Sequence, residues 1–253
     1  AGEPLADPRV ANRRARYLRM GFAISGSNTG HDAREQSGAS FARNRQQLLD
    51  YSFRSLHVTA ETSKQIINAY YGVLPTRSYY EGCSTGGRQG LILAQRFPDD
   101  FDGIVAGAPV HEFCGTFISF VWNARALAAA PIPQEKMLLV ADRLVANCDA
   151  VDGLKDGLIT DPRRCDFQLK RDLPLCPAAT DAPTCLTAAQ IGALEKIYSG
   201  PRSTDGRQWF PGWPLTAEMA NPANGRSGWD PWIVAAEGQK SISRNMVESV
   251  LAH

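Results

Sequence analysis

Residues 78–90 of the chain read SYYEGCSTGGRQG. Its centre, residues 82–86, is a G-x-S-x-G frame around Ser84, with a β-rich segment before it and a helical segment after it. A serine between a strand and a helix lies on a sharp turn, which needs small residues two positions before and after it. Gly82 and Gly86 occupy those positions. The stretch therefore predicts an exposed, strained Ser84 that acts as a nucleophile, and an inert serine in a glycine-rich turn is the alternative.

The helix expected after Ser84 has a chemical consequence. A helix begins with free backbone N–H groups and the positive end of its dipole. We expect the backbone N–H of Thr85 to donate to the oxyanion of a tetrahedral intermediate, where one such donor typically contributes about 3 kcal/mol.

Strand and helix signals alternate along the first 112 residues. Short apolar or β-rich runs predict strands over 21–28, 76–83 and 101–110, and helical spacing predicts helices over 54–72 and 86–98. This alternation indicates βαβ units, a parallel sheet and the α/β class. After residue 112 prolines and tryptophans cluster, the clearest helices are 133–148 and 187–200, and 201–235 reads as irregular chain. We therefore expect a core over 1–112 and a lid domain over 113–253.

Composition excludes several classes of partner. The chain has 253 residues, 27 Lys plus Arg and 26 Asp plus Glu, for a formal net charge of +1. Such a balance predicts no nucleic-acid partner. A membrane span needs about 18 consecutive apolar residues, and no run reaches that length, so no membrane partner is expected.

The six cysteines fit no zinc spacing, because no C-x-x-C occurs. Four of them lie in a proline-rich stretch, 148–185, which buries little apolar surface by its composition. We predict the disulfides Cys148–Cys165 and Cys176–Cys185 and hence a secreted or periplasmic protein. Six free thiols in a cytosolic protein are the alternative.

An acidic loop begins at residue 148 and reads CDAVDGLKDGL. Three carboxylates, Asp149, Asp152 and Asp156, fall within eight residues, and Gly153 and Gly157 allow tight turns. Clustered carboxylates repel unless a positive charge lies between them, and oxygen ligands in a turning loop suit Ca²⁺. The loop predicts a structural calcium site, and an exposed acidic turn that binds nothing is the alternative.

Several stretches together resemble the tannase and feruloyl esterase family of α/β-hydrolases. The resemblance is carried by GFAISGSNTGH, HVTAETSKQIINAYYG, YYEGCSTGGRQGLILAQRFPDDFDGIVAGAP and CDAVDGLKDGLITDPRRCDF. It implies a partial α/β-hydrolase core with a lid, an acyl-enzyme on Ser84, and a small-molecule ester of an aromatic acid such as a ferulate, gallate or terephthalate as substrate. It also implies that carbonyls of Leu154 and Leu158 join the calcium ligands and that Cys83 pairs with a cysteine beside the catalytic histidine. It assigns nothing to Cys114.

The chain departs from the family pattern in its histidines. The fold orders its triad as Ser, Asp, His, and the family's histidine is followed by cysteine, but the only histidines here are His31, His57, His111 and His253, and no His-Cys pair occurs. We therefore expect the catalytic Asp and His, and a glycine-rich oxyanion loop upstream, to lie outside this chain. A self-contained triad would combine Ser84 with His111 or His57. A catalytically incomplete remnant or a calcium-stabilised binding module is the alternative function.

Overall fold

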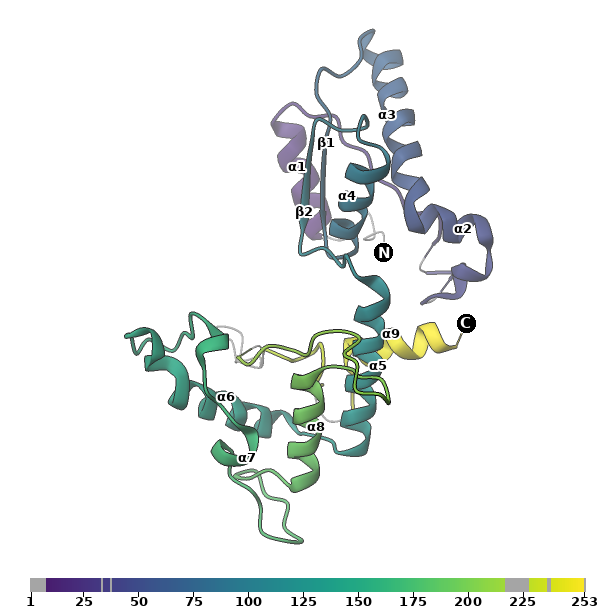
Figure 1. Ribbon diagram of the computed structural model, residues 1–253. Coiled ribbons are helices and arrows are strands. Elements are labelled where there is room, and N and C mark those ends of the chain that lie inside the picture. The colour runs from purple at the N-terminus through teal and green to yellow at the C-terminus, as the bar shows by residue number, and fades with distance from the viewer. Residues whose placement is uncertain (1–7, 33, 37, 217–227, 236–237, 253) are drawn as a thin grey trace. The chain divides into compact units, whose positions relative to one another are not determined.

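The computed structural model describes residues 8–32, 34–36, 38–216, 228–235 and 238–252. The chain divides into two units, of residues 1–113 with 249–253 and of residues 114–248 (Figure 1). Each unit is described by itself.

A βαβ unit forms the centre of the first unit. Its elements are β1 (Tyr79–Cys83), α4 (Thr85–Arg96) and β2 (Gly103–Gly107). The strands are parallel, with Tyr79 opposite Gly103 and Cys83 opposite Gly107. α4 packs on one face of this pair (Figure 1). This confirms the parallel strands and the helix expected over 76–110.

The other face of the sheet is less covered. Val105 is 64% exposed and Tyr79 is 59% exposed, although both faces of a parallel sheet are usually buried. Here α1 (Pro8–Arg19) contributes a hydrogen bond from the Tyr17 hydroxyl to Glu81, and Phe22 makes an edge contact with the Tyr79 ring.

The buried strand predicted over 21–28 is wrong. These residues form no ladder and are mostly exposed. A strand is stabilised by hydrogen bonds to a neighbouring strand, and β1 and β2 pair only with each other among the described residues.

A nearly continuous helical stretch precedes β1. It consists of a 3₁₀ turn η1 (Ser40–Arg43), α2 (Arg45–Leu49), a π turn η2 (Asp50–Arg54) and α3 (Ser55–Tyr71). Asn44 caps α2 by accepting from the backbone of Gln46 and Gln47. α3 ends at Gly72, which adopts the left-handed conformation with φ 74°. The helix predicted over 54–72 is confirmed.

The second unit is built mainly from helices. They are α5 (Phe113–Ala129, which begins in the first unit), α6 (Gln134–Cys148), α7 (Leu169–Asp172), α8 (Ala188–Ser199) and α9 (Ile242–Leu251, which ends in the first unit), with 3₁₀ turns η3 (Asp149–Asp152) and η4 (Pro162–Arg164). Both helices expected here, over 133–148 and 187–200, are confirmed. α8 starts with a capping box between Thr187 and Gln190.

The core of the second unit lies between α6 and α8. Its fully buried members include Met137, Val140 and Leu144 of α6, Leu194 and Ile197 of α8, and Trp229. The described part of the irregular stretch after α8 includes a short antiparallel bridge between Arg202 and Gln208.

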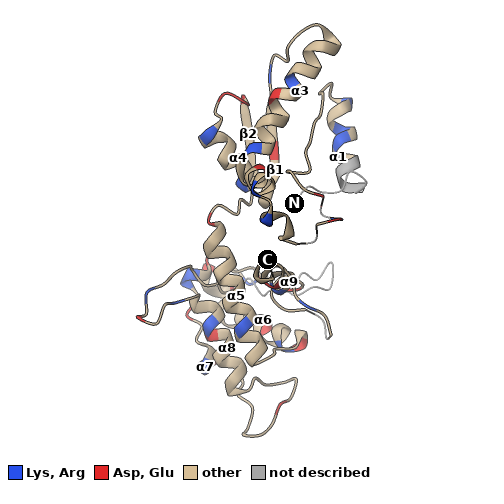
Figure 2. Ribbon diagram, turned by 90° about the vertical axis from the view of Figure 1, so that its right-hand side faces the viewer, with Lys and Arg blue, Asp and Glu red and all other residues tan. Residues whose placement is uncertain are grey.

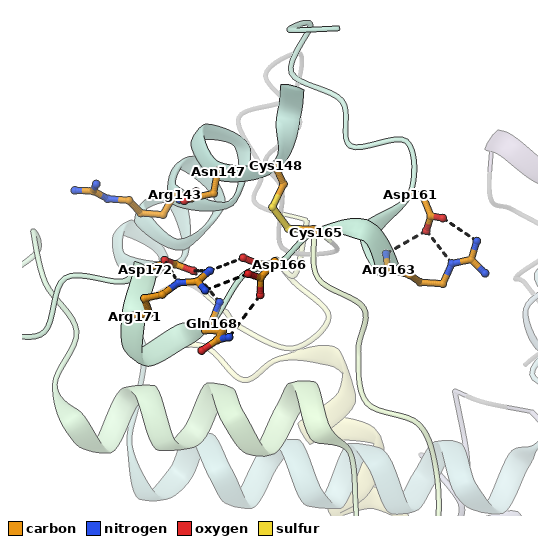
Figure 3. Close-up of a disulfide and its surroundings, with 10 residues drawn as sticks. All are labelled: Arg143, Asn147, Cys148, Asp161, Arg163, Cys165, Asp166, Gln168, Arg171 and Asp172. Atoms are coloured by element: carbon orange, nitrogen blue, oxygen red, sulfur yellow. Dashed lines mark hydrogen bonds and ion pairs between the residues drawn. A yellow bond between two sulfur atoms is a disulfide. The ribbon is translucent and has the colours of Figure 1, made fainter. Parts of the chain in front are cut away.

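Both predicted disulfides are present. Cys148 is bonded to Cys165, and Cys176 to Cys185, with Cα–Cα distances of 5.3 and 5.0 Å. Figure 3 shows the first of them, at the end of α6. A loop of this size loses chain entropy in the unfolded state that corresponds to about 3 kcal/mol of stability. The disulfides therefore stabilise the part of the second unit with the least regular structure.

Charges are mixed along both units, as Figure 2 shows. The close-up of Figure 3 contains two such local groups, Asp161 with Arg163 and Arg171 with Asp166 and Asp172. No helix in the described part is by itself long and apolar enough to cross a membrane, and α5 and α6 with η3 pass that test only as a pair bent by 110°.

Candidate active site

Ser84 lies where β1 ends and α4 begins. Its backbone has φ 59° and ψ −115°, and its side chain is exposed. A residue with a Cβ in such a region stores about 1–3 kcal/mol of strain, which persists only when neighbours hold it. The Ser84 N–H donates to the carbonyl of Gly107 at 3.0 Å, and its carbonyl accepts from the N–H of Arg88 at 3.0 Å. These bonds fix the backbone of Ser84 while leaving its hydroxyl accessible.

Two glycines of the motif make this turn sterically feasible, and they are not the pair expected. A Cβ on Gly82 would lie 2.5 Å from the Gly86 carbonyl oxygen, so Gly82 is required. A Cβ on Gly86 would meet nothing nearer than the Tyr80 hydroxyl at 3.6 Å, which is ordinary contact. Gly87 is the second restricted position, because its Cβ would lie 2.3 Å from the Gly107 oxygen and 2.8 Å from Pro109 Cα. The sequence shows two adjacent glycines, Gly86 and Gly87. Only the backbone of Gly107 and Pro109, at the end of β2 and just after it, makes Gly87 the more restricted of the two.

Tyr80 supports the same turn from β1. Its hydroxyl donates to the Gly86 carbonyl at 2.8 Å. Burial raises the pKa of Tyr80 to about 12, so the phenol stays protonated.

Thr85 is the first residue of α4, which begins one residue before the helix predicted over 86–98. Ser84 occupies the N-cap position and makes no side-chain capping bond. The N-terminal N–H groups of α4 therefore have no side-chain acceptor from the cap, and the helix dipole is positive at this end. The oxyanion role of the Thr85 N–H stays a prediction.

His57 lies too far from Ser84 to act as its base. Its Nδ1 is 2.8 Å from Asp100 Oδ2, and its ring stacks on Phe97 with centroids 4.0 Å apart. Phe97 caps the C-terminal end of the 12-residue α4, whereas Ser84 caps its N-terminal end. At 1.5 Å per residue the two ends are about 18 Å apart.

His31 is a packed histidine. It is 6% exposed and stacks on Phe41, with centroids 4.1 Å apart. Burial lowers the pKa of His31, and a hydrogen bond with the backbone of Thr29 opposes the shift only in part. Its Nδ1 is buried without a hydrogen-bond partner. This histidine is therefore neutral and structural near pH 7.

His111 directly follows a residue whose backbone contacts Ser84. The N–H of its neighbour Val110 reaches the Ser84 carbonyl at 3.4 Å. Its side chain is exposed, and no carboxylate in the described part binds it. His253 lies outside the described residues. The described part thus contains the candidate nucleophile Ser84 and no complete Ser–His–acid relay.

The acidic loop carries carboxylate oxygens, which are the atoms that bind Ca²⁺, but its side chains are not arranged as a metal site. Asp149 accepts from Gly157 N at 2.9 Å, Asp152 from Leu154 N at 3.0 Å, and Asp156 from Leu158 N at 3.0 Å. No three acidic, histidine or cysteine side chains in the described part form a group that could hold a metal ion.

Asp152 shows how the carboxylates of this loop are engaged. Its second oxygen accepts from the Thr160 hydroxyl, and this bond, with the backbone bond from Leu154, lowers the pKa of Asp152. In this arrangement the carboxylates of Asp149, Asp152 and Asp156 accept hydrogen bonds from the loop itself, and calcium binding stays a prediction.

Cys83 and Cys114 are free and exposed. Cys83 is the last residue of β1 and precedes Ser84 directly. Its expected partner beside a catalytic histidine stays a prediction, and the structure assigns no function to Cys114.

Comparisons with known proteins identify a matching family and similar sequences. The model of the family described as tannase and feruloyl esterase matches residues 4–252. Feruloyl esterase B of Aspergillus niger is 36% identical over 196 residues, covering 76% of this chain and 37% of the relative. A probable feruloyl esterase B-1 of Aspergillus oryzae is 34% identical over 232 residues, covering 89% and 42%.

Solved structures give the same result. The crystal structure of feruloyl esterase B from Aspergillus oryzae superposes with a TM-score of 0.72 at 32% identity, over 94% of this chain and 46% of that one. Tannin acyl hydrolase from Aspergillus niger superposes with a TM-score of 0.59 at 23% identity, which shows a shared fold. The chain spans less than half the length of these relatives.

Proposed function

Because the chain belongs to the tannase and feruloyl esterase family, we propose that it provides the nucleophile side of a serine esterase acting on esters of aromatic acids. The observation that carries this proposal is the backbone of Ser84, strained at φ 59° yet held by two hydrogen bonds, with its side chain exposed at the start of α4. A structural serine gains nothing from such a conformation, whereas a nucleophile needs it to meet a substrate carbonyl.

In the proposed reaction the Ser84 oxygen attacks the ester carbonyl carbon, and the carbonyl oxygen becomes an oxyanion. The Thr85 N–H donates to that oxyanion. The tetrahedral intermediate expels the alcohol and leaves an acyl group on Ser84, and water then releases the aromatic acid. A general base must take the proton of Ser84. His57 lies at the far end of α4 and no carboxylate in the described part binds His111, so we propose a histidine outside residues 1–253 as that base.

The substrate class rests on the relatives, which are named feruloyl esterases and a tannin acyl hydrolase. Both names describe esters of phenolic aromatic acids. We propose esters of aromatic acids as the substrate class here, and we propose that the second unit is a lid domain. The two disulfides support a secreted or periplasmic location, where they persist.

The test uses the full-length protein with methyl ferulate and a p-nitrophenyl ester as substrates. Ser84→Ala should abolish turnover and labelling by a serine-directed phosphonate. Ser63→Ala is the matched control, because the Ser63 hydroxyl only donates to Thr59 O of its own helix at 2.6 Å. His111→Ala should leave turnover intact. Undiminished turnover in Ser84→Ala would refute the proposal, and substrate binding without turnover by the unmodified protein would support a binding module instead.

A further inference from the structure

Arg88 is a buried arginine in the first turn of α4, four residues after Ser84. It is 9% exposed. Its Nη1 and Nη2 atoms donate to the carbonyl oxygens of Ser52 and Tyr51, at 3.3 and 3.2 Å. The guanidinium lies over the Tyr51 ring at 5.0 Å and over the Phe113 ring at 5.3 Å.

These surroundings are unusual for a buried charge. Buried arginines are ordinarily paired with a carboxylate, because an unpaired buried charge is costly. No carboxylate pairs with Arg88 in the described part of the chain, and its Nε is buried without a hydrogen-bond partner. The guanidinium instead contacts two carbonyls and two aromatic faces. The position of Arg88 therefore calls for an explanation other than the stability of an ion pair.

The carbonyls that Arg88 binds belong to consecutive residues of the π turn η2. π turns are rare and occur often at functional sites. A planar guanidinium reaches both oxygens at once, which an ammonium on a flexible stem does not. The Arg88 fork is therefore the specific link between the π turn and the first turn of α4.

We propose that Arg88 is a positioning residue for the nucleophile. Its backbone N–H closes the first turn of α4 on the Ser84 carbonyl, and its side chain ties that turn to η2. Displacing the turn moves both the Ser84 hydroxyl and the Thr85 N–H. The proposal rests on the proposed function, because Ser84 is the group that Arg88 positions.

Arg96 supplies a matched control on the same helix. It lies eight residues further along α4, and its guanidinium stacks on Phe53 of the same π turn at 4.1 Å. It therefore makes the same kind of contact to the same segment, at the end of α4 remote from Ser84. A general effect of losing a stacked arginine appears in both variants, and a positioning effect appears in Arg88 alone.

The experiment compares Arg88→Lys and Arg96→Lys in the full-length protein, by kcat and KM for methyl ferulate and by the rate of phosphonate labelling. We expect Arg88→Lys to lower kcat and the labelling rate about 10- to 100-fold, with KM within about twofold, because small misplacements of reacting groups carry penalties of this size. Arg96→Lys should stay within about twofold of the unmodified protein in all three.

Equal rates in the two variants would overturn the proposal even if their melting temperatures differ. If Arg88→Lys does not fold, Phe113→Leu replaces it: removing one of the two rings should lower kcat several-fold, and unchanged kcat overturns the proposal. An unmodified protein that neither turns over nor labels would overturn the proposed function as well. An active unmodified protein with insensitive Arg88 variants overturns this inference alone.

Discussion

Adding one methyl group at Gly87, and separately at Gly86, tests how the turn at Ser84 is built. The two glycines are adjacent in the first turn of α4, so Gly86→Ala and Gly87→Ala are the same change in the same element. At Gly86 the new Cβ meets only the Tyr80 hydroxyl, at 3.6 Å. At Gly87 it would lie 2.3 Å from the Gly107 oxygen, and real Cβ contacts are essentially never below 3.0 Å, so the Gly107 backbone must move by at least 0.7 Å.

The magnitudes can be worked from these contacts. Overpacking costs about 1–3 kcal/mol, and backbone neighbours place Gly87→Ala near the upper end. Replacing glycine by alanine in a helix returns up to about 1 kcal/mol in both variants. Gly87→Ala should therefore lose about 2 kcal/mol, a fall in Tm of about 4–8 °C for a protein of this size, while Gly86→Ala should be neutral or slightly stabilised.

Activity should change in the same order, because the carbonyl displaced at Gly107 is the one that accepts from the Ser84 N–H. Thermal melts and kcat for methyl ferulate, measured on the same preparations, check both effects. If Gly87→Ala melts at no lower a temperature than Gly86→Ala, the argument that a Cβ at Gly87 collides with the Gly107 oxygen is refuted.

Two further predictions concern ions. If the loop that carries Asp152 rearranges around Ca²⁺, adding calcium to chelator-treated protein, to about 100 times its Kd, stabilises the protein by about 2.7 kcal/mol. This corresponds to a rise in Tm of about 5–10 °C. The Asp152→Asn variant should not show this rise, and an unchanged Tm in the unmodified protein would contradict the site. Burial lowers the pKa of His31 below its ordinary value of 6.5, so its stabilising effect is full above about pH 6.5 and is lost as the pH falls below it. Unfolding free energies in urea at pH 7.5 and 5.0 should therefore differ more in the unmodified protein than in His31→Gln, and equal differences would contradict the assignment.

Local sequence signals predicted the centre of the first unit. A β-rich run, a glycine-flanked serine and a helix closed before Pro98 give β1, Ser84 and α4, because each signal acts within a few residues. Cysteine spacing in a proline-rich stretch likewise predicted both disulfides. The motif itself predicted the exposed, strained Ser84.

Features that depend on residues far away in the sequence could not be predicted from local patterns. α5 buries small residues such as Gly115, Ser119 and Ala126, so the helix carries no apolar stripe of the usual kind. The need for Gly87 and the contacts of Arg88 depend on segments that return from elsewhere in the sequence. The run over 21–28 has the composition of a buried strand, but strand formation depends on a neighbour that composition does not report.

The π turn at Asp50–Arg54 also determines how α3 is rotated about its axis relative to α2. A π turn holds about one residue more than an α-helical turn, so it rotates α3 by about 100° relative to its position in an unbroken helix. That rotation decides which side of α3 carries His57 toward Asp100. A single-residue deletion in the turn would swap the face of α3 that meets its neighbours, whereas the same deletion after Gly72 would only shorten a loop. Tolerance to insertions and deletions should therefore change abruptly along this part of the chain, with its minimum at the π turn.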